Sequence, residues 1–168
     1  MSEWRAIYAG SFDLLTNGHL WMIQQGVRLF GDLTVAVGVN PDKRPWFTTA
    51  ERIMMIRECT PELDVQVIEL PPRALLVEYA ADAGFDYLLR GIRTADDFRF
   101  ERAMRNVNAD IVSFVQTIAL IPPRELMDVS SSMVKGLIGC GDDWERVVGR
   151  YVPVPVVQVL AERATRAR

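Results

Sequence analysis

The segment GSFDLLTNGH at residues 10–19 gives the clearest indication of the fold. Strand-forming residues precede it at positions 6–8, and apolar residues recur at helical spacing over positions 20–30. The stretch therefore predicts a strand, a glycine turn and a helix that Thr16 can cap. The first backbone N–H groups of such a helix face the end of the strand and favour an anion such as phosphate. His19, the one histidine of the 168 residues, lies three residues beyond Thr16 in the first helical turn.

The composition predicts a single domain over residues 1–168. Hydrophobic residues make up 49% of the chain and charged residues 24%, which is enough apolar material for a core and argues against disorder. The net charge of -3 gives no general attraction to nucleic acid, so an anion site has to be built locally. Cys59 and Cys140 are far apart in the sequence, and this spacing suggests neither a zinc site nor a disulfide framework.

No segment of the sequence has the pattern of a targeting or membrane segment. The first residues lack the apolar core of a signal peptide. The longest apolar stretch, residues 112–123, is interrupted by Ser113, Gln116 and Thr117 and is too short to cross a bilayer. We therefore expect a soluble, cytoplasmic protein without a membrane or nucleic-acid partner.

Hydrophobic runs alternate with amphipathic runs along the chain. The expected strands cover residues 6–8, 33–39, 65–70, 87–89 and 117–121, and helices are expected between them. A capping-box pattern at Thr48 and first-turn acids after Thr94 mark two helix starts. This alternation predicts an α/β fold with a Rossmann-like, doubly wound, five-stranded parallel sheet and helices on both faces. Residues 139–168 are expected to form a C-terminal helical part, interrupted by Pro153 and Pro155.

Polar side chains follow several of these strands where the strand ends, and the carboxyl ends of parallel strands are where such folds bind ligands. These residues are Ser11, Lys43, Arg90, Arg93 and Ser130–Ser132. Two arginines directly after an apolar strand suggest an anion site, although pairing with Asp96, Asp97 or Glu101 is the alternative. Likewise, Lys43 could belong to a solvated loop and Glu101 could pair with Arg105. The serines could serve only to cap a helix.

His19 is better explained as a hydrogen-bond donor to phosphate than as a zinc ligand or a member of a catalytic triad. The sequence has no second histidine and no cluster of cysteines or carboxylates with metal-ligand spacing. Ser11 lacks the G-x-S-x-G elbow of hydrolases, and neither a Walker A nor a G-x-G-x-x-G fingerprint occurs.

Six short motifs, in their order along the chain, resemble those of the phosphopantetheine adenylyltransferase family of the nucleotidyltransferase superfamily. They are GSFD and T-x-G-H at 10–19, N-P-x-K at 40–43, R-G-x-R at 90–93, D-F-x-F-E at 97–101 and S-S-S-x-V-K at 130–135. The T-x-G-H signature alone is moderately specific, whereas the whole set, covering residues 5–137, is highly specific. The resemblance implies transfer of AMP from ATP to the phosphate of 4'-phosphopantetheine, giving dephospho-coenzyme A and pyrophosphate.

The resemblance also implies which residues carry this reaction. His19 would stabilise the transition state at the α-phosphate, with Lys43 and Arg93 as further catalytic residues. Acceptor-binding residues would be Ser11, Lys43, Leu76 and Arg90, with Leu76 against the pantetheine arm. The ATP site would contain Ser11, Phe12, His19, Gly91, Ile92, Arg93, Glu101, Leu126, Met127, Asp128, Val129, Ser130, Ser131 and Ser132. Mg²⁺ would be held by the phosphates and not by protein side chains, and the resemblance implies a homo-oligomer, commonly a hexamer.

Three positions depart from the family pattern. Leu14 stands where the family usually has proline, and GSFDLL at 10–15 also resembles the related cytidylyltransferases. Trp21 and Gly136 replace residues that are usually polar or acidic, while the R-T-x-G-x-S-T-T motif of the cytidylyltransferases is absent. Two alternatives stay open: a nucleotidyltransferase that uses ATP or CTP with another phosphorylated acceptor, and a non-catalytic nucleotide-binding sensor.

Overall fold

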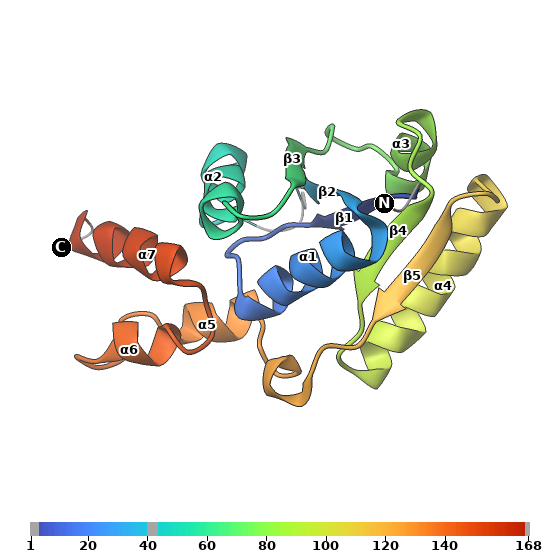
Figure 1. Ribbon diagram of the computed structural model, residues 1–168. Coiled ribbons are helices and arrows are strands. Elements are labelled where there is room, and N and C mark those ends of the chain that lie inside the picture. Colours follow the sequence, from blue (N-terminus) through green and yellow to red (C-terminus); the bar gives the residue numbers. More distant parts are fainter. Residues whose placement is uncertain (1–3, 40–43, 167–168) are drawn as a thin grey trace.

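A five-stranded parallel sheet forms the centre of the protein in the computed structural model, which describes residues 4–39 and 44–166 (Figure 1). Its strands are β1 (Arg5–Gly10), β2 (Asp32–Val37), β3 (Val65–Glu69), β4 (Tyr87–Gly91) and β5 (Gln116–Leu120). They are ordered β3-β2-β1-β4-β5, and each neighbouring pair is parallel. The predicted fold class is confirmed. Because the strand order reverses at β1, a crevice is expected at the carboxyl ends of β1 and β4.

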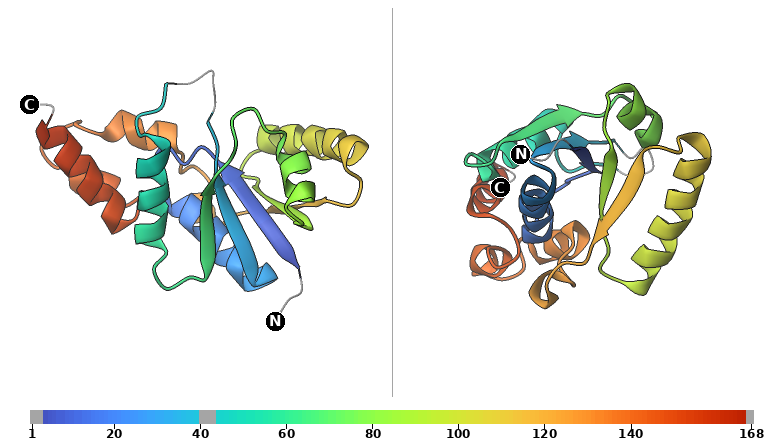
Figure 2. Two further views of the ribbon diagram at one scale, coloured as in Figure 1. Left: turned by 90° about the horizontal axis from the view of Figure 1, so that it is seen from above. Right: turned by 45° about the vertical axis from the view of Figure 1, so that its right-hand side comes forward.

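Helices cover both faces of this sheet (Figure 2). They are α1 (Asn17–Phe30), α2 (Thr49–Cys59), α3 (Leu76–Asp82), α4 (Ala95–Ile111), the 3-10 turn η1 (Arg124–Leu126), α5 (Ser131–Leu137), α6 (Trp144–Val148) and α7 (Val154–Arg166). α3 and α4 lie on one face, and α1, α2 and the C-terminal helices lie on the other. None of the helices in the described residues is long and apolar enough to cross a membrane.

Successive residues of β1 point to opposite faces and so contribute to two cores. Tyr8 belongs to the larger core, together with Met22 of α1 and Leu160 of α7. Ile7 belongs to the smaller core, together with Val77 of α3. The C-terminal helices therefore pack into the same core as the sheet.

Three threonines cap helices at the predicted positions. The side chains of Thr16, Thr48 and Thr94 each accept a hydrogen bond from the backbone N–H three residues on. The expectation about the two terminal prolines is wrong, because they begin a helix and do not interrupt one. Pro153 directly precedes α7 and Pro155 lies in its first turn, where a missing N–H costs no helical hydrogen bond.

α4 differs from the other long helices because none of its residues is buried. Phe100, Met104, Val107 and Ile111 follow one another at helical spacing along one face and are between 37% and 59% exposed. An apolar face of this kind is typical of a surface that another chain covers.

Candidate active site

Two cavities open at the carboxyl edge of the sheet, and both are lined by His19 and Arg93. The first, which we call the strand-end cavity, has a volume of about 330 Å³ and lies between the ends of β1 and β4, the start of α1 and the first turns of α4. The second has a volume of about 240 Å³. We call it the cationic cavity because its lining, among the described residues, contains Arg44, Arg52, Arg93 and Lys135 but a single carboxylate, Asp13. The predicted convergence of polar residues at this edge of the sheet is thus present.

The imidazole of His19 is held by the turn that begins α1. The backbone N–H of Thr16 donates to Nδ1 of His19 at 3.1 Å, while Thr16 Oγ1 accepts from the backbone N–H of His19 at 3.4 Å. Since Nδ1 is an acceptor, the proton of the neutral ring lies on Nε2. Burial, and to a smaller extent the charge of Arg93, lower the pKa of His19 to about 4. At neutral pH, His19 is an uncharged hydrogen-bond donor on the wall that the two cavities share.

Phe12 supports His19 from behind. The two rings meet edge to face, with centroids 5.2 Å apart and an interplanar angle of 71°. Only 1% of the surface of Phe12 is exposed. Phe12 is not among the described residues that line the two cavities. A Cβ atom on Gly10 would come within 3.0 Å of the Phe12 ring, which explains the glycine at the end of β1.

Two of the first three N–H groups of α1, those of Asn17 and His19, are not free for a ligand, which corrects part of the expectation from the sequence. The backbone N–H of Asn17 donates to the carbonyl of Tyr151 at 2.8 Å, and its side-chain amide donates to the carbonyl of Arg150 at 3.2 Å. The backbone N–H of His19 is taken by Thr16. The segment between α6 and α7 therefore closes this helix end, and the turn presents an imidazole to the cavities in place of these two N–H groups.

Arg90 and Glu101 form a bidentate ion pair in the strand-end cavity. Arg90 Nε and Nη2 donate to the two carboxylate oxygens at 2.9 and 2.6 Å, and Nη1 donates to the carbonyl of Ala9 at 3.2 Å. Of the alternatives that the sequence left open, Arg90 takes the pairing with Glu101, while Arg105 donates to Asn106. Two of the five N–H groups of Arg90 have no partner in the described part of the chain, so they are available to a ligand.

Arg93 is held from two sides at the boundary between the cavities. Its Nη1 donates to the carbonyl of Val129 at 2.9 Å, and its Nε lies 3.5 Å from the carboxylate of Asp97. Asp97 also accepts from the backbone N–H groups of Arg93 and Thr94, at 3.0 and 3.3 Å. These contacts place a fixed positive charge next to His19 and position Val129 at the edge of the strand-end cavity.

Ser130–Ser132 line the cationic cavity, but two of their three hydroxyls hold the chain in place. Ser130 Oγ accepts from the backbone N–H of Met133 at 3.1 Å and so caps α5. Ser131 Oγ donates to the carbonyl of Leu14 at 2.7 Å. Ser132 is exposed, and no described residue makes a hydrogen bond to its hydroxyl. The O–H of Ser130, which only accepts a hydrogen bond, also keeps its donor. Lys43, the predicted acceptor-binding lysine, lies outside the described residues.

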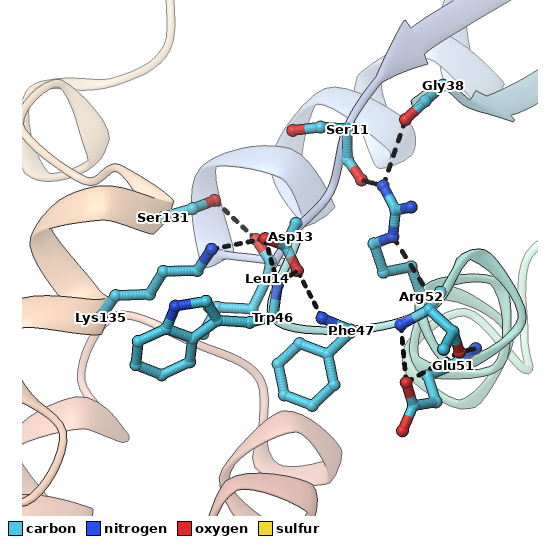
Figure 3. Close-up of polar contacts among 11 residues, drawn as sticks. Ser11, Asp13, Leu14, Gly38, Trp46, Phe47, Glu51, Arg52, Ser131 and Lys135 are labelled. Atoms are coloured by element: carbon cyan, nitrogen blue, oxygen red, sulfur yellow. Dashed lines mark hydrogen bonds and ion pairs between the residues drawn. The ribbon is translucent and has the colours of Figure 1, made fainter. Parts of the chain in front are cut away.

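Asp13 is a functional candidate that the sequence did not reveal. Its carboxylate accepts from the backbone N–H groups of Trp46 and Phe47 at 2.9 to 3.1 Å and from Lys135 Nζ at 2.5 Å (Figure 3). Partial burial acts to raise the pKa of Asp13, but these three donors hold it below its ordinary value. Asp13 thus ties the loop after β1 to the segment before α2 and to α5. The signal for this role is Lys135, 122 positions away, which no local pattern can connect to Asp13.

Arg52 is a second residue that the sequence did not reveal. It lies in the first turn of α2, yet only 2% of its surface is exposed. Its Nη1 donates to the carbonyls of Ser11 and Gly38, which belong to the loops after β1 and β2 (Figure 3). The capping pattern that predicted α2 says nothing about this inward-pointing cation.

Some predicted site residues lie outside both cavities. Leu76 packs with the smaller core at the start of α3, and the structure does not bring it to either cavity. Gly91 and Val129 do line the strand-end cavity, and Ser11 lines the cationic cavity. The predicted ATP-site residues that line neither of these two cavities are Phe12, Ile92, Leu126, Met127 and Asp128.

Known proteins resemble this chain over nearly its whole length. A cytidylyltransferase-like family model matches residues 7–137. The phosphopantetheine adenylyltransferase of Chromobacterium violaceum is 51% identical over 156 residues, which cover 93% of this chain and 94% of that protein. Its counterpart from Lacticaseibacillus paracasei is 34% identical over 160 residues, covering 95% of this chain and 93% of that protein.

A solved structure agrees with the fold. Plasmodium falciparum nicotinic acid mononucleotide adenylyltransferase, complexed with NaAD, superposes with a TM-score of 0.69 over 94% of each chain. Its identity of 14% makes this a likeness of fold alone. The matched sequences carry the assignment further: with 51% identity over more than nine-tenths of both chains, this chain belongs to the phosphopantetheine adenylyltransferase family.

Proposed function

We propose that this protein transfers AMP from ATP to the phosphate of 4'-phosphopantetheine, giving dephospho-coenzyme A and pyrophosphate. The observation that carries the proposal is the neutral imidazole of His19 on the wall between a cavity with paired charges and a cavity with excess positive charge. In the reaction, an oxygen of the acceptor phosphate forms a bond to the α-phosphorus of ATP while the bond to the leaving pyrophosphate breaks. The family assignment supports the same pair of substrates.

Transfer between two phosphates needs no covalent intermediate on the protein, so positioning and charge stabilisation are the tasks of its side chains. The Nε2–H of His19 donates to a non-bridging oxygen of the α-phosphate, where negative charge grows in the transition state. Because the ring is neutral at pH 7, it gives this hydrogen bond without losing a proton. Arg93, fixed beside His19 by Asp97 and Val129, neutralises charge on the outer phosphates of ATP.

Arg90, Ser11 and Lys43 complete the proposed site as residues that bind the acceptor phosphate. Arg90 can do so without breaking its pair with Glu101, because two of its N–H groups are free of partners in the described residues. Ser11 lies at the cationic cavity with an exposed position after β1. Leu76 is left as a proposed contact to the pantetheine arm.

We also propose that Mg²⁺ enters the site on the phosphates of ATP. Residues 4–39 and 44–166 contain no group of three histidine, cysteine or carboxylate side chains arranged to hold a metal ion. The one carboxylate of the cationic cavity, Asp13, is already bound by three donors. The side chains present are thus ligands for phosphate, and the bound ion would offset phosphate charge during the transfer.

We propose that the protein forms a homo-oligomer, a hexamer, in which neighbouring copies cover the apolar face of α4. Phe100, Met104, Val107 and Ile111 form this face, and a single copy leaves them exposed.

We propose that the protein acts in the cytoplasm. The proposed partners are ATP, 4'-phosphopantetheine and further copies of this chain, and neither nucleic acid nor membrane is among them.

Pyrophosphate release tests the proposed reaction. The protein is mixed with ATP or CTP and with 4'-phosphopantetheine or other phosphorylated acceptors. We expect release with ATP and 4'-phosphopantetheine and little with CTP. Turnover with a different acceptor alone would show that the acceptor is wrong, and tight ATP binding without turnover on any acceptor would indicate a sensor.

A further inference from the structure

Arg52 is a buried cation that the roles proposed above leave unexplained. Its Nη1 donates to the carbonyls of Ser11 and Gly38 at 2.7 and 3.1 Å (Figure 3). Its Nε donates to the carbonyl of Thr48 at 3.3 Å, and its Nη2 donates to Thr49 Oγ1 at 3.1 Å. Four of the five N–H groups of the guanidinium are therefore used, and each of them meets a neutral oxygen.

No carboxylate balances the charge of Arg52 within residues 4–39 and 44–166. Asp13, the carboxylate that lines the same cavity, is bound by Lys135 and by the backbone of the segment before α2. A guanidinium withdrawn from water is unfavourable unless an opposite charge lies near it. Arg52 is only 2% exposed, and the surface that it retains belongs to the lining of the cationic cavity. The missing negative charge therefore belongs in that cavity.

We propose that Arg52 is a further phosphate-binding residue, whose counter-charge is a substrate phosphate in the cationic cavity. The inference rests on the proposed function, because AMP transfer between phosphorylated substrates brings such groups to this place. The two N–H groups of Arg52 Nη1 fix the distance between the loops after β1 and β2. The one N–H group of Arg52 without a partner, together with the charge of the guanidinium, then acts on the phosphate. The outer phosphates of ATP and the phosphate of the acceptor share this chemistry, so binding has to be measured for each.

Two substitutions at this position and one matched control test the inference. Arg52→Met removes the charge, and Arg52→Lys keeps the charge but loses the planar fork. Arg57→Met is the control, because Arg57 is exposed on the same helix and donates to the carbonyl of Val67. For each variant we would measure the rise in Tm caused by inorganic pyrophosphate or by 4'-phosphopantetheine, and the KM of both substrates at several salt concentrations.

We expect Arg52→Met to lose most of the Tm rise from one of the two ligands and to raise the KM of the matching substrate about tenfold or more. Its KM should also depend less on salt than that of the wild type, a change that loop distortion alone would not produce. Arg52→Lys should retain the salt dependence with a KM raised several-fold. Arg57→Met should leave all of these values unchanged.

The outcomes separate this inference from the proposed function. If the wild type releases pyrophosphate while folded Arg52→Met keeps both Tm rises and both KM values, the inference is overturned and the function stands. If the wild type neither turns over nor responds to either ligand, both are overturned. Should Arg52→Met fail to fold, Arg52→Lys decides, because unchanged KM values in that variant contradict the role of the guanidinium.

Discussion

The strand-end cavity and the cationic cavity differ in how their charges are balanced. In the strand-end cavity, Arg90 pairs with Glu101 and Arg93 pairs with Asp97. In the cationic cavity, the described lining holds one carboxylate, Asp13, which pairs with Lys135, and no ion pair to another described residue joins Arg44 or Arg52. Paired charges attract an anion less strongly than unpaired positive charges in a confined space do. Under the proposed function, this difference favours phosphate binding at and beyond the wall that the two cavities share, where His19 lies.

Removing His19, the hydrogen-bond donor on this wall, should have the largest effect on turnover. We expect His19→Ala to lower turnover by roughly two to three orders of magnitude, because one preorganised donor to the transition state is lost. The KM values of both substrates should change little. His19→Gln, which retains an N–H donor, should recover part of the rate, and steady-state pyrophosphate release measures both variants. Wild-type turnover in His19→Ala would show that the wall between the cavities is not the place of reaction.

Removing the carboxylate of Asp13 should loosen the cationic cavity as a whole. Asp13→Ala leaves the ammonium of Lys135 and two backbone N–H groups without their acceptor, so we expect the free energy of unfolding to fall by about 3 kcal/mol. Urea denaturation measures this change, and Lys135→Met with the double variant completes a thermodynamic cycle. Additive effects of the two substitutions would contradict a direct pair between Asp13 and Lys135.

The neutrality of His19 predicts how stability depends on pH. The pKa of His19 is lowered from 6.5 to about 4 in the folded chain, so the unfolded chain binds more protons between these values. Stability from this source is complete above pH 6.5 and is lost as the pH falls toward 4. We expect the wild type to lose about 2 kcal/mol more than His19→Gln between pH 7 and pH 5 in urea titrations. Equal losses in the two proteins would mean that the imidazole titrates normally.

Arg90 tests whether a residue with a paired charge can still bind the acceptor. We expect Arg90→Ala to raise the KM of the acceptor substrate about tenfold, the scale of one charged hydrogen bond, with a smaller change in the KM of ATP. Arg105→Ala is the control, because Arg105 is an exposed residue of α4 that donates to Asn106. A selective rise in the KM of ATP would exchange the proposed roles of Arg90 and Arg93.

The parts of the fold that depend on neighbouring residues could be predicted from the sequence. Thr16, Thr48 and Thr94 each cap a helix through a partner three positions away, so the pattern and the contact are nearly the same information. The place of His19 followed in the same way from the strand, the turn and the cap. The tautomer and the lowered pKa did not follow, because they depend on how deeply the turn is buried.

Most contacts that define the cationic cavity could not be predicted, because they join distant positions. Asp13 and Lys135 are 122 residues apart, and the two carbonyls that Arg52 Nη1 contacts, those of Gly38 and Ser11, lie 14 and 41 positions before it. Arg90 had several acidic residues within reach in the sequence. The direction of α4 selects Glu101 among them, and local periodicity does not show that direction.

The three consecutive serines, Ser130–Ser132, have different roles although they are the same residue type. Their substitution gives the smallest effects that we expect on stability and on the KM of ATP. Ser131→Ala should lower the free energy of unfolding by about 1 kcal/mol, because the Leu14 carbonyl loses its donor. Ser132→Ala should leave stability unchanged, since Ser132 is exposed, and should raise the KM of ATP a few-fold if its hydroxyl meets the outer phosphates. Urea denaturation and ATP titration of both variants measure the contrast. If both serines affect stability alone, the cationic cavity binds its phosphate through its basic side chains, and the hydroxyls only shape it.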